Sequence, residues 1–91
     1  MNAVGAQVVI SGLVQGVGYR YSCYHLARQL GLTGWVKNRP DGSVEVLVEG
    51  DRGGIEILID QLKVGPPSAV VKRVDISWTN FTGKYNDFDV G

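Results

Sequence analysis

A glycine-rich segment carries the clearest chemical signal in this sequence of 91 residues. From Gly12 to Arg20 it reads GLVQGVGYR. Its three glycines let the backbone curl so that successive N–H groups point inward, and Arg20 adds a planar fork that matches two oxygens of a phosphate. The segment therefore predicts a pocket for one compact tetrahedral anion. The same glycines would also suit a strand that packs tightly against a helix.

Two well-known nucleotide-binding loops are excluded by the residues around these glycines. A P-loop ends in Gly-Lys-Ser or Gly-Lys-Thr, and the sequence contains no such tripeptide. The dinucleotide-binding fingerprint needs a third glycine after Gly16 and Gly18, where this chain has Tyr-Arg-Tyr. The chain is also too short for a doubly wound nucleotide-binding fold, so neither nucleotide interpretation survives.

Composition excludes further classes of protein. Nine basic and nine acidic side chains give a net charge of zero, which argues against a dedicated nucleic-acid or membrane-surface binder. A single cysteine, Cys23, excludes an internal disulfide framework and a cysteine-rich metal site, and its position predicts a place in the core. We expect one domain over residues 1–91 and, because no targeting signal or spanning segment is visible, a cytoplasmic location.

Hydrophobic periodicity predicts the elements that must position the glycine-rich segment. Apolar residues alternate in the expected strands, and they recur at spacings of three and four in the expected helices. The connection at residues 39–42 has the turn chemistry of a hairpin, Arg-Pro-Asp-Gly. The predicted strands are 8–12, 34–38, 44–49, 70–79 and a short final 88–90; the predicted helices are 20–30 and a second one that begins after Asp51 and ends before Gly65.

The order of these elements, β-α-β-β-α-β, predicts an α+β fold, the ferredoxin-like α/β sandwich. In it an antiparallel sheet carries both helices on one face. Strands 8–12 and 34–38 are joined through a helix, so they run parallel and their carboxyl ends lie at the same edge. We therefore expect the glycine-rich segment, the first helical turn and Asn38 to converge there.

Two long motifs give the chain a resemblance to the acylphosphatase family. The segment GLVQGVGYR, residues 12–20, resembles the first signature of that family. The segment GWVKN, residues 34–38, followed by DGSV at 41–44, resembles the second, and GPPSAV at 65–70 resembles a further stretch. The resemblance covers essentially the whole chain. It implies the ferredoxin-like sandwich and the hydrolysis of acyl phosphates to carboxylate and inorganic phosphate, with no cofactor and no metal.

The resemblance also implies roles for individual residues. Arg20 matches the phosphate-binding arginine of the family, and Asn38 matches the asparagine that orients the attacking water. Tyr19 departs from the commoner Phe and Ser22 from a frequent aromatic residue, so the pocket wall or the helix packing is expected to differ. The residues implied to bind substrate, mainly through main-chain donors, are Gln15, Gly16, Val17, Gly18, Tyr19 and Arg20.

The chemistry of an acyl phosphate explains why two side chains can suffice. The leaving group is a carboxylate, with a pKa of about 4, so it departs without being protonated. In a loose phosphoryl-transfer transition state the entering water carries little charge until late, so a strong base is dispensable. This agrees with a chain whose only histidine, His25, is expected on the outward face of its helix.

Three other functions remain open to the same topology. An RNA-recognition module needs aromatic residues on its central strands, and residues 7–12 and 43–49 contain none. A non-catalytic domain that senses small anions or mediates interactions would not need both Arg20 and Asn38. The third is a domain of a larger carbamoyl-phosphate-processing maturation protein. We expect a free-standing enzyme, a monomer that binds neither nucleic acid nor membrane.

Overall fold

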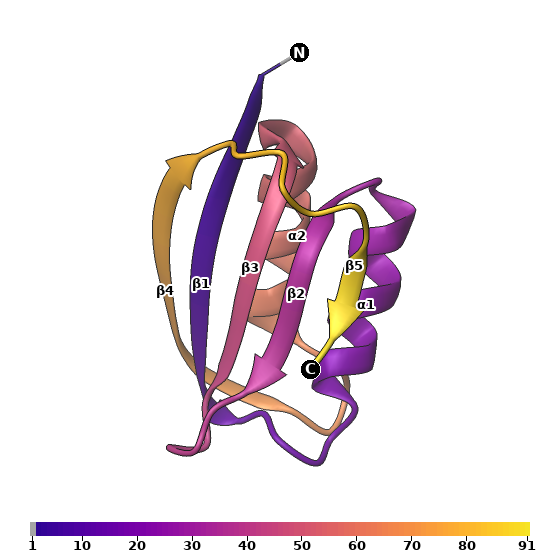
Figure 1. Cartoon of the computed structure of the whole chain (residues 1–91). Coiled ribbons are helices and arrows are strands. Elements are labelled where there is room, and N and C mark those ends of the chain that lie inside the picture. The colour runs from indigo at the N-terminus through magenta and orange to yellow at the C-terminus, as the bar shows by residue number, and fades with distance from the viewer. Residues whose placement is uncertain (1) are drawn as a thin grey trace.

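A five-stranded sheet with two helices on one face forms the protein in a computed structural model that describes residues 2–91 (Figure 1). The strand order is β4-β1-β3-β2-β5, so the ferredoxin-like sandwich is confirmed. All seven expected elements are present, with β1 starting earlier than the alternation predicts. The elements are β1 (Ala3–Leu13), α1 (Tyr19–Gln29), β2 (Thr33–Asn38), β3 (Val44–Asp51), α2 (Arg52–Val64), β4 (Val70–Asn80) and β5 (Phe88–Val90).

The strands β1 to β4 pair antiparallel, and β5 adds one parallel pairing at the edge beside β2. In Figure 1 the arrows of β2 and β5 point the same way. Phe88 pairs with Gly34, and after the end of β5 the N–H of Gly91 donates to the carbonyl of Val36 at 2.7 Å. The last residues of the chain therefore lie against the strand that ends in Asn38.

The core fills the space between the sheet and the two helices. Alternate residues of the central strands point inward because successive side chains of a strand face opposite sides of the sheet. Cys23 is 2% exposed, which confirms its expected place in the core, and His25 is exposed. The fully buried side chains of the sheet and helices include Val8, Ile10, Val36, Val44, Val46, Val48, Ala27, Ile55 and Leu58.

A buried carboxylate fixes the long connection between β4 and β5. Glu49, near the end of β3, is 4% exposed and accepts hydrogen bonds from the N–H and hydroxyl of Thr82, at 3.1 and 2.8 Å. It also accepts one from the N–H of Gly83 at 3.0 Å. Three donors satisfy the charge that burial would otherwise make costly. The connection is thereby held across the end of the sheet, where it directs the chain into β5.

Candidate active site

The connection between β1 and α1 turns the main chain so that several of its N–H groups have no partner within residues 2–91. Gly16 and Gly18 have φ angles of 72° and 79°, and Gly18 is the N-cap of α1, without a side chain that caps the helix. Of the hydrogen bonds formed within residues 2–91, none is donated by the main-chain N–H groups of 16–20. The positive end of the helix dipole adds to these free donors, and no acidic residue lies in the first turn.

The three glycines of this segment serve two different purposes. A Cβ at Gly12 would collide with the main-chain oxygen of Val70, so Gly12 permits the close approach of β1 and β4. A Cβ at Gly16 or Gly18 would meet no atom within 4 Å, so these two are required by their positive φ and not by crowding. Tight packing therefore explains Gly12, whereas Gly16 and Gly18 shape an open turn.

Arg20 lies in the first turn of α1 and is partly exposed. Its Nη1 donates a hydrogen bond to the main-chain oxygen of Gly91. Because the N–H of Gly91 is bonded to Val36 of β2, this contact ties the guanidinium to the strand that carries Asn38. No sequence pattern indicates this partner, since it lies 71 positions further along the chain.

Asn38 is the last residue of β2 and pairs with Val44 of β3. Its Oδ1 is enclosed and accepts no hydrogen bond from any group within residues 2–91. Leaving a buried polar group without a partner costs about 1–3 kcal/mol, so such a group in a native structure calls for an explanation. The oxygen is an acceptor that a ligand or a bound water could satisfy.

The side chain of Gln15 connects the glycine-rich segment to the hairpin between β2 and β3. Its Nε2 donates to the carbonyl of Arg39 at 2.8 Å and to the carbonyl of Ser43 at 2.9 Å. Sequence reasoning expected Gln15 to contribute through its main chain and missed this contact. Arg20 is connected to β2 through Gly91, and Gln15 is connected to the hairpin that follows β2. Asn38 lies in the chain between these two points of attachment.

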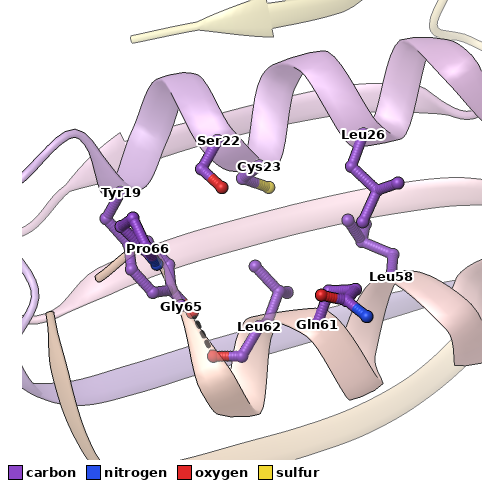
Figure 2. A pocket seen from close by; sticks show the side chains of 9 residues that line it. All are labelled: Tyr19, Ser22, Cys23, Leu26, Leu58, Gln61, Leu62, Gly65 and Pro66. Atoms are coloured by element: carbon purple, nitrogen blue, oxygen red, sulfur yellow. Dashed lines mark hydrogen bonds between the residues drawn. The ribbon is translucent and has the colours of Figure 1, made fainter.

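Tyr19 contributes only its main chain to the segment, because its side chain turns into the helix layer. It is 2% exposed, and its hydroxyl donates to the carbonyl of Leu62 at 2.6 Å. Figure 2 shows the ring beside Gly65 and Pro66, where a Cβ on Gly65 would come within 3.0 Å of it. The departure from Phe therefore concerns the packing of α1 on α2.

The packing of α1 on α2 leaves a narrow cavity between the two helices (Figure 2). Tyr19, Ser22 and Cys23 line it together with residues of α2. Its free space of about 10 Å³ holds at most one water molecule, so it is no substrate site. Burial raises the pKa of the Tyr19 hydroxyl, and it raises the pKa of the Cys23 thiol to about 12, so both groups are neutral near pH 7.

Lys37 and Arg39 flank Asn38 in the sequence, and Lys37 is directed away from the core. The exposed Lys37 places its Nζ 4.6 Å from the centre of the Trp35 ring. A cation over the face of an aromatic ring is attracted by the ring's quadrupole. Within residues 2–91 no group of three or more His, Cys, Asp or Glu side chains could hold a metal ion. Nor does that part of the chain contain a helix long and apolar enough to cross a membrane.

This chain resembles known proteins over nearly its whole length. Residues 6–90 match the sequence model of the acylphosphatase family. An acylphosphatase of Acaryochloris marina is 47% identical over 89 residues, which cover 98% of this chain and 95% of the relative. The structure of an acylphosphatase from Coxiella burnetii is 42% identical and superposes with a TM-score of 0.93 over 99% of this chain and 94% of that one.

The same fold also occurs as a small part of a much larger protein. A crystal structure of full-length HypF in a phosphate- and nucleotide-bound form is 29% identical, with a TM-score of 0.85. The match covers 99% of this chain but only 12% of HypF. The relatives of similar length are acylphosphatases throughout nearly their whole sequences. By sequence and by structure, the chain belongs to the acylphosphatase family.

Proposed function

We propose that this chain hydrolyses the carboxyl–phosphate bond of acyl phosphates, with Arg20 and the main-chain N–H groups of residues 15–20 holding the phosphoryl group. Asn38 orients the attacking water through its side-chain oxygen. The observation that carries these roles is the unpartnered Oδ1 of Asn38 at the strand end to which the loop and Arg20 are tied. Membership of the family supports the reaction itself.

The reaction is an in-line displacement at phosphorus. Water attacks the phosphorus atom, the bond between phosphorus and the bridging oxygen breaks, and that oxygen leaves on the carboxylate with the electron pair. One proton of the water stays with the new phosphate, and the other is taken up by a phosphate oxygen. No protein acid is needed because the leaving carboxylate is a weak base, and no strong protein base is needed because the transition state is loose.

The protein's contribution is then positioning and charge stabilisation. Arg20 and the loop N–H groups face the three equatorial oxygens of the phosphoryl group, where negative charge is concentrated in the transition state. Asn38 accepts a hydrogen bond from the water and so holds its oxygen in line with the bond that breaks. Removing one fixed donor from such a site typically lowers the rate by about 10²–10³-fold.

The substrate class, the oligomeric state and the location of the enzyme are inferred from the family and from the sequence. The substrates, acyl phosphates, are small molecules. The product, inorganic phosphate, is expected to compete with them for Arg20 and the loop N–H groups. A monomer located in the cytoplasm remains our prediction. A non-catalytic anion-binding domain is not favoured, because Asn38 would have no task in binding phosphate alone.

The kcat/KM for benzoyl phosphate, compared with those for p-nitrophenyl phosphate and ATP, tests the reaction. We expect high activity on the first and almost none on the other two, since only the first has a carboxylate leaving group. Equal activity on all three would contradict the proposal.

Two variants and a control test the residue roles. Arg20→Ala is expected to abolish turnover and inhibition by phosphate, whereas Asn38→Ala lowers kcat and leaves phosphate inhibition in place. The matched control is Arg28→Ala, which removes an exposed arginine of the same helix from its ion pair with Asp87. Near-wild-type kcat/KM in Arg20→Ala or Asn38→Ala would overturn the role assigned to that residue.

A further inference from the structure

We infer that Gln15 is a positioning residue: its side chain fixes the phosphate-holding loop against the hairpin that follows Asn38. The structure shows the two bonds that do this, from Nε2 to the carbonyl of Arg39 and to the carbonyl of Ser43. The inference rests on the proposed function, because it concerns the geometry of the same site. It gives the side chain of Gln15 a task that main-chain binding of phosphate does not require.

The chemistry of the two partners settles which end of the Gln15 amide faces the hairpin. Both partners are carbonyl oxygens, which accept hydrogen bonds and cannot donate them. Only the NH₂ end of the amide can serve both, and doing so uses both of its protons. The side chain therefore has no donor left for a phosphoryl oxygen. Its two donors act on the position of the loop relative to the hairpin and not on the phosphoryl group.

The hairpin that accepts these bonds is closed by hydrogen bonds of its own. The carbonyl of Arg39 already accepts from the N–H of Gly42 at 3.1 Å, and the carbonyl of Ser43 accepts from the N–H of Arg39 at 2.8 Å. Asp41 accepts from both the N–H and the hydroxyl of Ser43, which is 5% exposed. Gln15 thus supplies a second donor to each of two carbonyls in a closed turn. Because this turn is closed by several hydrogen bonds, the bonds from Gln15 fix the position of the loop relative to the hairpin. Bonds to a mobile loop would not do so.

The two halves of the proposed site come from different elements, which is why such a link matters. Arg20 and the loop hold the phosphoryl group, whereas Asn38 at the end of β2 holds the water. The strands β1 and β2 do not pair with each other, since β3 lies between them. In-line attack depends on the relative position of the two halves, and a misplacement of about 1 Å can cost about 10²-fold in rate.

The inference predicts a separation of kcat from phosphate binding. Gln15→Met keeps the length of the side chain and removes both donors. We expect it to lower kcat for benzoyl phosphate by about 10–100-fold. Competitive inhibition by inorganic phosphate uses only Arg20 and the loop, so its inhibition constant should change by less than about threefold. The matched control is Gln7→Met, which removes an exposed bond of 2.7 Å to Glu45 on the open face of the sheet.

A double variant distinguishes positioning from a general loss of structure. In a chain that already carries Asn38→Ala, no water is held for Gln15 to align. Gln15→Met should then lower kcat by less than about twofold further. Full multiplication of the two single effects would overturn the inference, as would a rise in the phosphate inhibition constant with kcat unchanged. Gln15→Asn keeps the amide donors but shortens the side chain by one methylene group. It replaces Gln15→Met in the same experiment if Gln15→Met does not fold.

The outcomes also separate this inference from the proposed function. A wild-type protein that fails to hydrolyse benzoyl phosphate would overturn the proposed function and the role of Gln15 with it. An active wild-type protein whose Gln15→Met variant keeps its kcat would overturn the role of Gln15 alone. Circular dichroism and the rise in Tm on addition of phosphate establish that each variant compared is folded.

Discussion

The guanidinium of Arg20 is bonded to the main-chain oxygen of Gly91, so the first turn of α1 is joined to the residue that follows β5. Gly91 is in turn held by its N–H to Val36 at 2.7 Å. An arginine side chain loses considerable rotamer freedom when it is fixed, and a fixed partner reduces what substrate binding must still immobilise. The edge strand β5 therefore contributes to the orientation of the proposed phosphate-binding group.

Phe88 is the side chain that anchors β5, because it is 1% exposed and lies in the core. We expect Phe88→Ala to lower the free energy of unfolding by about 3–5 kcal/mol, through lost burial and the cavity that remains. In the molecules that stay folded, Arg20 loses its fixed partner and phosphate inhibits less well. Urea denaturation and the phosphate inhibition constant measure the two effects.

The other phenylalanine provides the control for Phe88. Phe81 is 48% exposed in the connection before β5, and Phe81→Ala should change the unfolding free energy by no more than about 0.5 kcal/mol. A Phe88→Ala variant that loses stability but binds phosphate as the wild type does would show that β5 does not orient Arg20.

Glu49 gives a second prediction, because its carboxylate accepts three hydrogen bonds from Thr82 and Gly83. In Glu49→Gln one oxygen becomes an NH₂ group, which faces donors and leaves at least one main-chain N–H of the connection without an acceptor. We expect a loss of about 1–3 kcal/mol in the free energy of unfolding, measured by urea denaturation at pH 7.

Glu45→Gln is the natural comparison for Glu49→Gln. Glu45 lies on the same strand, and its carboxylate accepts an exposed bond from Gln7. Its replacement should leave stability within about 0.5 kcal/mol of the wild type. If both glutamates gave the same small change, the carboxylate of Glu49 would not be what holds the connection to β5.

The sequence predicted the fold well because its signals are local. Alternation within strands, helical spacing and a hairpin turn each depend on neighbours within a few residues, and these also placed Cys23 in the core and His25 at the surface. The order of the elements then restricted the topology. Even β5, three residues long, was visible as a short apolar alternation.

The contacts that complete the site were not predictable in the same way. Gln15 meets its partners 24 and 28 positions later, and Arg20 meets Gly91 after 71. No periodic pattern encodes such pairs, since they follow from how whole strands are arranged. The parallel pairing of β5 and the burial of Glu49 belong to the same class. The sequence predicts which residues carry chemistry but not what holds them in place.

Asp41 provides a prediction about pH, because the hydrogen bond from the Ser43 hydroxyl, and then that from its N–H, hold the pKa of its carboxyl below the ordinary value of 3.8. A lowered pKa means that the folded state favours the ionised carboxylate. Asp41 therefore adds stability above about pH 4, and this contribution is lost as the pH falls through the lowered pKa. We expect Asp41→Asn to reduce the loss of stability between pH 5 and pH 2, measured by thermal denaturation.

A control carboxylate separates this effect from the general behaviour of surface acids. Asp60 is exposed on α2, and Asp60→Asn should leave the slope of stability against pH close to that of the wild type in the same range. If stability changed equally with pH in the wild type and in Asp41→Asn, the charged carboxylate of Asp41 would not stabilise the turn.

Cys23 gives the last prediction, since its thiol is 2% exposed and burial raises its pKa to about 12. Only thiolate reacts readily with disulfide reagents, so at pH 8 the folded protein should not be labelled, while the urea-unfolded chain reacts at once. Labelling of the native protein then requires unfolding, and phosphate, which binds the folded state, should slow it further. In Arg20→Ala the phosphate effect should disappear while the rate without phosphate stays measurable. Rapid, complete labelling of the folded wild type at pH 8 would show that α1 and α2 open far more readily than their packing around Tyr19 indicates.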